Sequence, residues 1–206
     1  QANDLLLDSH HSGLPVVDDQ DRLQYLVFKK DIRDERHHPL QVVDQNKRLL
    51  CVAAINTHDH AERVPALVLA GVDAVAIDSS DGFSVFQRDA IRWIAANYPH
   101  LPIIGGNIIT AAGFRYLAES GANAIKVGMG GGSICITQEQ KGTGRGLATS
   151  ILDVVAERDL FFAETGRYVP VIADGGIVTS KDMVIAMAMG ADVVMAGRWF
   201  ARMEES

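Results

Sequence analysis

Cys135 is the residue best suited to covalent chemistry, because it closely follows a glycine-rich segment. Four of the five residues from Gly128 to Gly132 are glycine, so the backbone there can fold closely around an ion or a ligand. A thiolate on such a loop could attack a bound substrate. The residue types alone leave a second interpretation equally open, because free cysteine is usually a small buried apolar residue. We expect Cys51, inside an apolar segment, to be of that buried kind.

Two glycine turns near the end of the sequence predict a phosphate site. Residues 174–176 directly follow the apolar segment 169–173, and Gly197-Arg198 follows the apolar segment 193–196. Backbone N–H groups in such turns bind phosphate oxygens, and many barrels do this with the loops after their seventh and eighth strands. The pattern indicates a phosphate-bearing ligand without specifying a reaction. The alternative is that these turns only redirect the chain.

Polar and glycine residues also follow three earlier apolar segments, at 56–60, 78–82 and 105–107. Polar loops after nearly every strand are typical of a ligand site at one edge of a parallel sheet. The first loop contains His58 and His60, a pair that suits a metal ion. No third ligand at a sensible spacing accompanies them, so we favour a role in capping the loop.

The elements that must position these residues alternate in type. Strands are predicted at 50–55, 74–77, 103–104, 124–127, 169–173 and 193–196, and helices at 61–70, 85–97, 111–120, 148–164 and 180–189. Strands that are apolar throughout are typical of a parallel sheet covered on both faces. Three helix-to-strand corners, at 69–75, 119–125 and 188–194, each contain a glycine suited to a left-handed helix end. This order predicts an α/β fold with right-handed crossovers.

The number of strands leaves the architecture open. A TIM (β/α)8 barrel has eight strands in about 250 residues, whereas residues 49–206 contain six predicted strands. A doubly wound open sheet would accommodate six strands equally well. The polar loops favour the barrel, with about six of its strands present.

The first 48 residues are expected to form a separate region. Segments 14–17 and 23–28 predict two short strands joined by an acidic turn. The charged run at 29–38 is expected to be a solvated connector. We therefore divide the chain into a first region at 1–30, a linker at 31–48 and a candidate catalytic domain at 49–206.

The composition excludes several classes of protein. The chain has 206 residues, 48% apolar and 22% charged, which is ample for a buried core and unlike a disordered chain. No apolar run approaches the roughly 18 residues of a membrane span. The net charge of −7 argues against general nucleic-acid binding. Two cysteines cannot form a disulfide framework, which favours a reducing, cytoplasmic location.

Several segments together resemble the IMP dehydrogenase / GMP reductase family. The most specific is the cysteine loop, Gly-x-Gly-Gly-Gly-Ser-Ile-Cys-Ile-Thr at 128–137. The other matching segments, in the family's order, lie at 76–80, 104–107, 125–127, 139–146 and 172–177. Residues 1–30 resemble the end of a CBS domain, which many members insert after their first two barrel strands. That insertion would explain why six strands remain.

The resemblance implies an NAD-dependent oxidoreductase of purine (GMP) biosynthesis, acting as a cytoplasmic homotetramer. In the family's dehydrogenases, the cysteine that Cys135 matches attacks C2 of IMP and hydride passes to NAD⁺. Water then hydrolyses the covalent thioimidate to XMP, and Thr137 matches a threonine near that water. IMP and NAD are the implied partners, with neither nucleic acid nor a membrane.

The resemblance also implies binding residues. Asp174 matches the carboxylate that holds the IMP ribose hydroxyls. The residues that match the phosphate cradle and its turn are Ser133, Gly175, Gly176, Gly197 and Arg198. Those on the NAD side are Asp78, Ser79, Ser80, Gly128 and Gly130. Backbone carbonyls of Gly130, Gly132 and Cys135 match half of a monovalent-cation site, usually filled by K⁺.

Two departures limit these implications. Family members carry a mobile flap and further cation ligands beyond the eighth strand, whereas the given sequence ends at Ser206. We therefore expect a piece of a longer protein, able at most to form the covalent adduct. Lys126 lies just before the cysteine loop, at a position where arginine is the alternative. Lysine at this position resembles the family's microbial branch.

Other functions stay open. GMP reductases share the barrel and the cysteine but use NADPH, and Thr-Thr-Arg usually follows their cysteine, whereas this chain has Ile136-Thr137-Gln138. A non-catalytic nucleotide sensor would suit the CBS-like segment but not an intact cysteine loop. A flavin-dependent barrel oxidoreductase would explain the phosphate site but not that loop.

Lys141 and Arg145 suit substrate contact and plain solvation equally.

Overall fold

The protein, described here by a computed structural model over residues 2–204, consists of two compact units. The smaller unit extends to Leu50, and the larger unit begins at Cys51. An antiparallel hairpin organises the smaller unit, and a parallel sheet organises the larger one.

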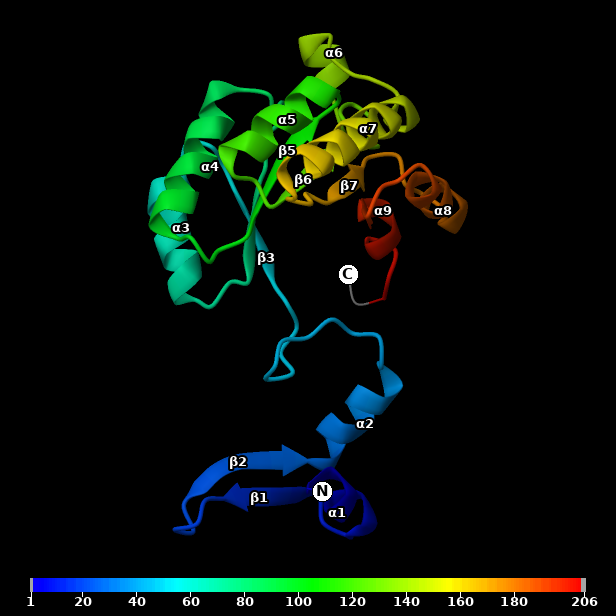
Figure 1. Cartoon of the computed structure of the whole chain (residues 1–206). Coiled ribbons are helices and arrows are strands. Elements are labelled where there is room, and N and C mark those ends of the chain that lie inside the picture. The colour runs from blue at the N-terminus through cyan, green and yellow to red at the C-terminus, as the bar shows by residue number, and fades with distance from the viewer. Residues whose placement is uncertain (1, 205–206) are drawn as a thin grey trace. The chain divides into compact units, whose positions relative to one another are not determined.

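The smaller unit is a hairpin with a helix on each side of it in the sequence. Its elements are α1 (Ala2–Asp8), β1 (Gly13–Val17), β2 (Leu23–Phe28) and α2 (Lys29–His37). The two predicted strands are present and pair antiparallel, as Figure 1 shows. The turn between them is held by the Asp18 carboxylate, which accepts hydrogen bonds from the backbone N–H groups of Gln20 and Arg22.

Most described residues of the charged run at 29–38 are exposed, as expected, but the run is helical, because α2 occupies nearly all of it. Lysine and arginine are good helix formers, and the single apolar residue of the helix, Ile32, is 4% exposed. Lys29 Nζ donates hydrogen bonds to the carbonyls of Leu7 and Ser9, at 3.2 and 3.0 Å, and so joins α2 to the end of α1. Helix α1 was not predicted from the sequence.

The larger unit alternates strands and helices. Its strands are β3 (Val52–Ile55), β4 (Ala74–Ile77), β5 (Ile103–Ile108), β6 (Ala124–Val127), β7 (Val171–Asp174) and β8 (Val193–Met195). Its helices are α3 (His60–Leu69), α4 (Val85–Asn97), α5 (Ala111–Ser120), α6 (Thr137–Lys141), α7 (Leu147–Thr165), α8 (Ser180–Ala188) and α9 (Gly197–Phe200). Neighbouring strands pair in parallel. The helices surround the curled sheet, as Figure 1 shows.

The strand order decides between the two architectures. The sheet runs β3-β4-β5-β6-β7-β8, in sequence order throughout. A doubly wound sheet reverses direction at an internal switch point, and the strands described here have none. Successive right-handed crossovers in one direction curl a sheet toward closure. The fold is therefore a partial TIM barrel, as predicted. Because its strands are parallel, all of their carboxyl ends lie on one rim.

Two predictions near strand ends are wrong. Residues 105–107 belong to β5, which extends to Ile108, and are not a loop after it. Cys51 is exposed and precedes β3, instead of being buried in a strand. β3 is at the edge of the sheet, so side chains near its start, such as Val52, lack cover from a second neighbouring strand. The same edge effect leaves β8 more exposed than β5, β6 or β7.

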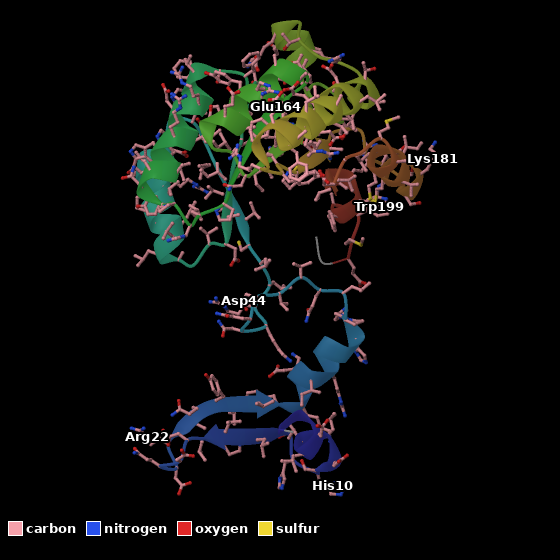
Figure 2. The ribbon with its side chains drawn as sticks, viewed as in Figure 1. His10, Arg22, Asp44, Glu164, Lys181 and Trp199 are labelled. Atoms are coloured by element: carbon pink, nitrogen blue, oxygen red, sulfur yellow. The ribbon has the colours of Figure 1, made fainter. Side chains whose placement is uncertain are left out.

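A hydrophobic core lies between the sheet and the helices. It includes Ile77 on β4, Ile94 on α4 and Phe114 on α5, each fully buried. α5 is also joined to α7 by Arg115, which pairs with Glu157 and with Glu164, the latter at 2.7 Å and labelled in Figure 2.

The three glycine corners adopt the predicted conformation. Gly71, Gly121 and Gly190 have φ values of +83°, +114° and +103°. A side chain with a Cβ is disfavoured there, so glycine lets each helix end and the chain turn at once into the next strand. Between residues 2 and 204, no helix has the length and apolar character that a bilayer span requires.

Phe114→Ala should lower the free energy of unfolding by about 3–5 kcal/mol, because it leaves a cavity in the core. Phe114 is fully buried, and its ring packs edge-on to that of Phe161 at 6.1 Å. Urea unfolding of the protein measures the loss. Leu160→Ala, at a 56% exposed position of α7, is the control and should change stability by less than about 0.5 kcal/mol. Equal losses in the two variants would contradict this placement of the core.

Candidate active site

A cavity of about 270 Å³ lies at the rim formed by the carboxyl ends of the strands. Its walls come from the residues that follow β4, from β5 and β6, from the cysteine loop and from the end of β7. The lining residues are Asp78, Ser79, Ser80, Asn107, Lys126, Gly128, Met129, Gly130, Gly131, Gly132, Cys135, Thr137, Asp174 and Gly175. Two carboxylates, a lysine and a thiol therefore share one small polar space.

Most of the catalytic and binding residues that the family resemblance implies line this cavity, and four do not. Ser133 is exposed on the cysteine loop, and Gly176 follows Gly175 without lining the cavity. Gly197 and Arg198 are the first two residues of α9, and one residue separates this helix from β8. The structure therefore brings the cysteine loop, the Asp78–Ser80 segment, Asp174 and Gly175 together, and leaves the other expected phosphate residues outside the lining of the cavity.

The Cys135 thiol is half-buried and faces Thr137. Its Sγ lies 3.3 Å from Thr137 Oγ1, and its backbone N–H donates to the Gly132 carbonyl at 3.1 Å. Hydrogen bonds with the Thr137 side chain and backbone hold the pKa of Cys135 below its ordinary value, while desolvation and the Asp174 charge act in the opposite direction. A lowered pKa increases the fraction of thiolate, which is the nucleophilic form.

Asn107 joins the loops on which the expected ligand contacts lie. Its Nδ2 donates to Asp174 Oδ2 and to the Gly128 carbonyl, both at 2.8 Å. In the sequence, Asn107 stood out only as part of a segment that matches the family, with no function assigned to it. A polar side chain inside an otherwise apolar strand was the signal that could have singled it out.

Lys126 is the second residue whose position was not foreseen. It lies on β6, is only 7% exposed and lines the cavity. A buried lysine usually requires an acidic or anionic partner. Its place in the wall therefore favours a ligand that carries negative charge.

Close contact between two glycine loops shapes the floor of the cavity. Gly128 has φ +135°, and a Cβ there would lie 1.8 Å from the carbonyl oxygen of Asp174. A Cβ on Gly131 would lie 3.4 Å from the backbone of Gly175. Only glycine at position 128 allows the backbone after β6 to approach β7 so closely.

Two basic residues after the cysteine loop have structural partners. Lys141 Nζ donates a hydrogen bond to Ser80 Oγ, which connects α6 to the loop after β4. Arg145 Nη1 donates to the Ile109 carbonyl at 2.8 Å and to Asp153 Oδ2 at 2.7 Å. Each of the two residues therefore has a partner within the protein, although Lys141 is also exposed.

The histidines of the first polar loop have contacts away from the cavity. His60 Nδ1 bonds to the Thr57 carbonyl at 2.8 Å, and its ring packs against Trp93. The His58 ring packs against Phe86. No group of three histidine, cysteine, aspartate or glutamate side chains arranged for a metal ion occurs among the described residues.

Comparison with known proteins identifies the family. A model of the IMP dehydrogenase / GMP reductase domain matches residues 13–206. The chain belongs to this family. Its whole length is 54% identical to inosine-5'-monophosphate dehydrogenase of Tritrichomonas foetus and 41% identical to that of Toxoplasma gondii, covering 41% and 37% of those proteins. It is 45% identical, over 93% of its length, to the Escherichia coli enzyme of the same name, of which it covers 38%.

The chain therefore spans about two fifths of the length of these relatives. The matching family domain includes both the partial barrel and most of the smaller unit. The cavity described above lies entirely within the barrel unit of this IMP dehydrogenase / GMP reductase domain.

Gly128→Ala should destabilise the protein by about 3 kcal/mol or more, because the new methyl group would overlap the Asp174 carbonyl and φ +135° strains any Cβ. Thermal and urea unfolding measure the loss. Gly146→Ala is the matched control, since its Cβ would meet nothing closer than 3.9 Å and its φ is −55°. A Gly128→Ala variant as stable as this control would show that the two loops are not in contact.

Thr137→Val should move the titration of the Cys135 thiol upward, because the hydrogen bonds of Thr137 lower the pKa of that thiol. Less thiolate is then present at neutral pH, so alkylation of Cys135 by iodoacetamide should become several-fold slower there and recover at alkaline pH. The rate is measured as a function of pH by mass spectrometry. Cys135→Ser reports the background from exposed Cys51. An unchanged profile would mean that Thr137 does not stabilise the thiolate.

Proposed function

We propose that the protein oxidises IMP to XMP with NAD⁺, through a covalent intermediate on Cys135. The observation that carries this proposal is a half-buried thiol, with its pKa lowered by Thr137, in the same cavity as the Asp174 carboxylate. The relatives named inosine-5'-monophosphate dehydrogenase support the choice of substrate. GMP reduction remains the alternative, because the matching family model includes both activities.

The proposed reaction begins when the Cys135 thiolate adds to C2 of the hypoxanthine ring. NAD⁺, when bound, accepts the hydride that leaves C2, and a thioimidate between Cys135 and the base remains. Water then adds to C2 and the carbon–sulfur bond breaks, which yields XMP and the free thiol. Thr137, at 3.3 Å from Sγ, is suited to hold this thiol and the water beside it.

Asp174 is proposed to bind the ribose hydroxyls of IMP. Its Oδ2 accepts the hydrogen bond from Asn107, which fixes the direction of the carboxylate. The other carboxylate oxygen is then proposed to accept a ligand hydroxyl, a charge-assisted hydrogen bond of the stronger kind. Backbone N–H groups are proposed to hold the IMP phosphate, with the hydroxyl of Ser133 and the turn residues Gly175, Gly176, Gly197 and Arg198.

The NAD side is proposed to be the wall formed by the loop after β4. Asp78 is suited to accept hydrogen bonds from ribose hydroxyls, as carboxylates do in other dinucleotide sites. Its neighbours in this proposal are Ser79, Ser80, Gly128 and Gly130, which all line the cavity. Ser80 is already held by Lys141, so this wall has a defined position relative to α6.

A monovalent cation such as K⁺ fits the donor chemistry of the cysteine loop. Gly130 and Gly132 belong to a glycine segment whose carbonyls, with that of Cys135, are the neutral oxygen ligands that K⁺ binds. The Gly132 carbonyl already accepts a hydrogen bond from Cys135 N, so the loop is folded back on itself at this point. We propose that these three carbonyls hold part of the coordination shell and that the ion orders the loop.

The wider context is likewise a proposal. Residues 1–30 are proposed to be the end of a CBS domain, residues 31–48 a linker, and residues 49–206 part of the catalytic barrel. We further propose a homotetramer that acts in the cytoplasm in guanine nucleotide synthesis. The relatives' names support the enzyme class on which these proposals rest.

The full-length protein should form NADH when mixed with IMP and NAD⁺, followed by absorbance. Cys135→Ser should abolish turnover, because serine is a far weaker nucleophile at neutral pH. Cys51→Ser is the matched control and should keep normal turnover, since Cys51 lies outside the cavity. NADPH consumption with GMP, without NADH formation from IMP, would identify a reductase instead. Binding of IMP with neither reaction would favour a nucleotide sensor.

A further inference from the structure

Gln87, on α4, is a buried polar residue outside the cavity, and within the part of the chain that the structure describes its side chain bonds only to the main chain of β5. It is fully buried, and both polar atoms of its amide are bonded to Gly106. Gln87 Nε2 donates to the Gly106 carbonyl, and Gly106 N–H donates to Gln87 Oε1, each at 2.7 Å. The side-chain amide therefore pairs with this backbone as a neighbouring strand would.

The strand needs this partner because its regular pairing is interrupted at this point. Gly106 is opposite Lys126 on β6, but the next pair is Ile108 with Val127, so Asn107 is an extra residue on β5. Bulges of this kind redirect a side chain and recur next to active sites. A Cβ on Gly106 would lie 2.7 Å from the Lys126 carbonyl, so the strands are in close contact there.

The residue that the bulge presents is Asn107, which connects three loops of the rim. Its backbone N–H donates to the Ser79 carbonyl at 3.1 Å, and its carbonyl accepts from Gly82 N–H at 2.7 Å, both in the loop after β4. Its side chain bonds to Gly128 and to Asp174. A shift of Asn107 would therefore be transmitted to the Asp174 carboxylate.

We propose that Gln87 is a positioning residue for the nucleotide site: by clamping Gly106 from behind, it fixes the bulge that directs Asn107, and Asn107 holds the Asp174 carboxylate toward the ribose. This inference rests on the proposed function, because it takes Asp174 to bind the IMP ribose hydroxyls. Gln87 itself touches no substrate. Its effect reaches the ligand only through Gly106 and Asn107.

Gln87→Met tests this inference in the full-length enzyme, because methionine has a similar length but cannot form either hydrogen bond. Calorimetry should show IMP bound about tenfold more weakly, as expected for a misplaced binding group. Affinity for 2′,3′-dideoxyinosine monophosphate, which lacks both ribose hydroxyls, should change by less than about twofold, since that ligand gains nothing from Asp174. A merely structural role for Gln87 would not separate these two ligands.

Ile94→Ala is the matched control. Ile94 is also fully buried on α4, and its truncation removes core packing without touching Gly106. It should lower the unfolding temperature while leaving IMP affinity unchanged. Gln87→Glu is the second variant, because a carboxyl group in this fully buried place is neutral and so keeps the size of the side chain, an acceptor for Gly106 N–H and an O–H donor for the Gly106 carbonyl. Its loss of IMP affinity should be smaller than that of Gln87→Met.

The possible outcomes separate this inference from the proposed function. Unchanged IMP affinity in Gln87→Met and Gln87→Glu would overturn the positioning role alone. Equal losses for IMP and the dideoxy analogue would also overturn it, because the effect would then not pass through Asp174. If the unsubstituted enzyme failed to bind IMP, the proposed function would be overturned instead. The proposed effect of Gln87 on IMP binding would then be overturned as well.

Discussion

The side-chain amide of Asn107 donates both of its hydrogen bonds across the rim of the barrel, to the backbone after β6 and to the carboxylate at the end of β7. Parallel strands bring their carboxyl ends to one rim, but nothing in the ladder hydrogen bonds fixes the loops beyond those ends. One amide with two donors supplies that connection. The loop after β4 joins the same residue through the backbone. The position of the residues on this rim therefore depends on how Asn107 is held.

The cavity built around this connection has an uneven distribution of charge. Lys126 is nearly buried in its wall, and Asp78 and Asp174 stand in the same lining. The thiol of Cys135 is close enough to Asp174 for that carboxylate to oppose its ionisation, and the hydrogen bonds of Thr137 outweigh the opposition. A phosphate-bearing ligand would complement the lysine, while hydroxyls would complement the carboxylates.

Glycine has two distinct functions in the barrel unit. At Gly71, Gly121 and Gly190 it permits a left-handed helix end, which is a local requirement of the backbone. At Gly106 and Gly128 it leaves room for another strand, which is a requirement of packing between segments distant in the sequence. The first group keeps the alternation of helices and strands compact. The second group allows the loops of neighbouring strands to come close enough to share hydrogen bonds at the site.

The sequence by itself determined the order of the six strands and of the five longer helices in the barrel, because buried strands and amphipathic helices have different periodicities, whereas the short helices α6 and α9 were not predicted. α4 and α5 have their predicted bounds, and the cysteine loop was recognised from its glycines and thiol. Only the tertiary structure decided the rest. Strand order excluded the open sheet, the edge position of β3 exposed Cys51, and a buried isoleucine docked the charged helix α2. Asn107, Gln87 and Lys126 gain their importance from partners distant in the sequence. Such contacts have no local pattern, because they arise only when strands from separate segments lie side by side.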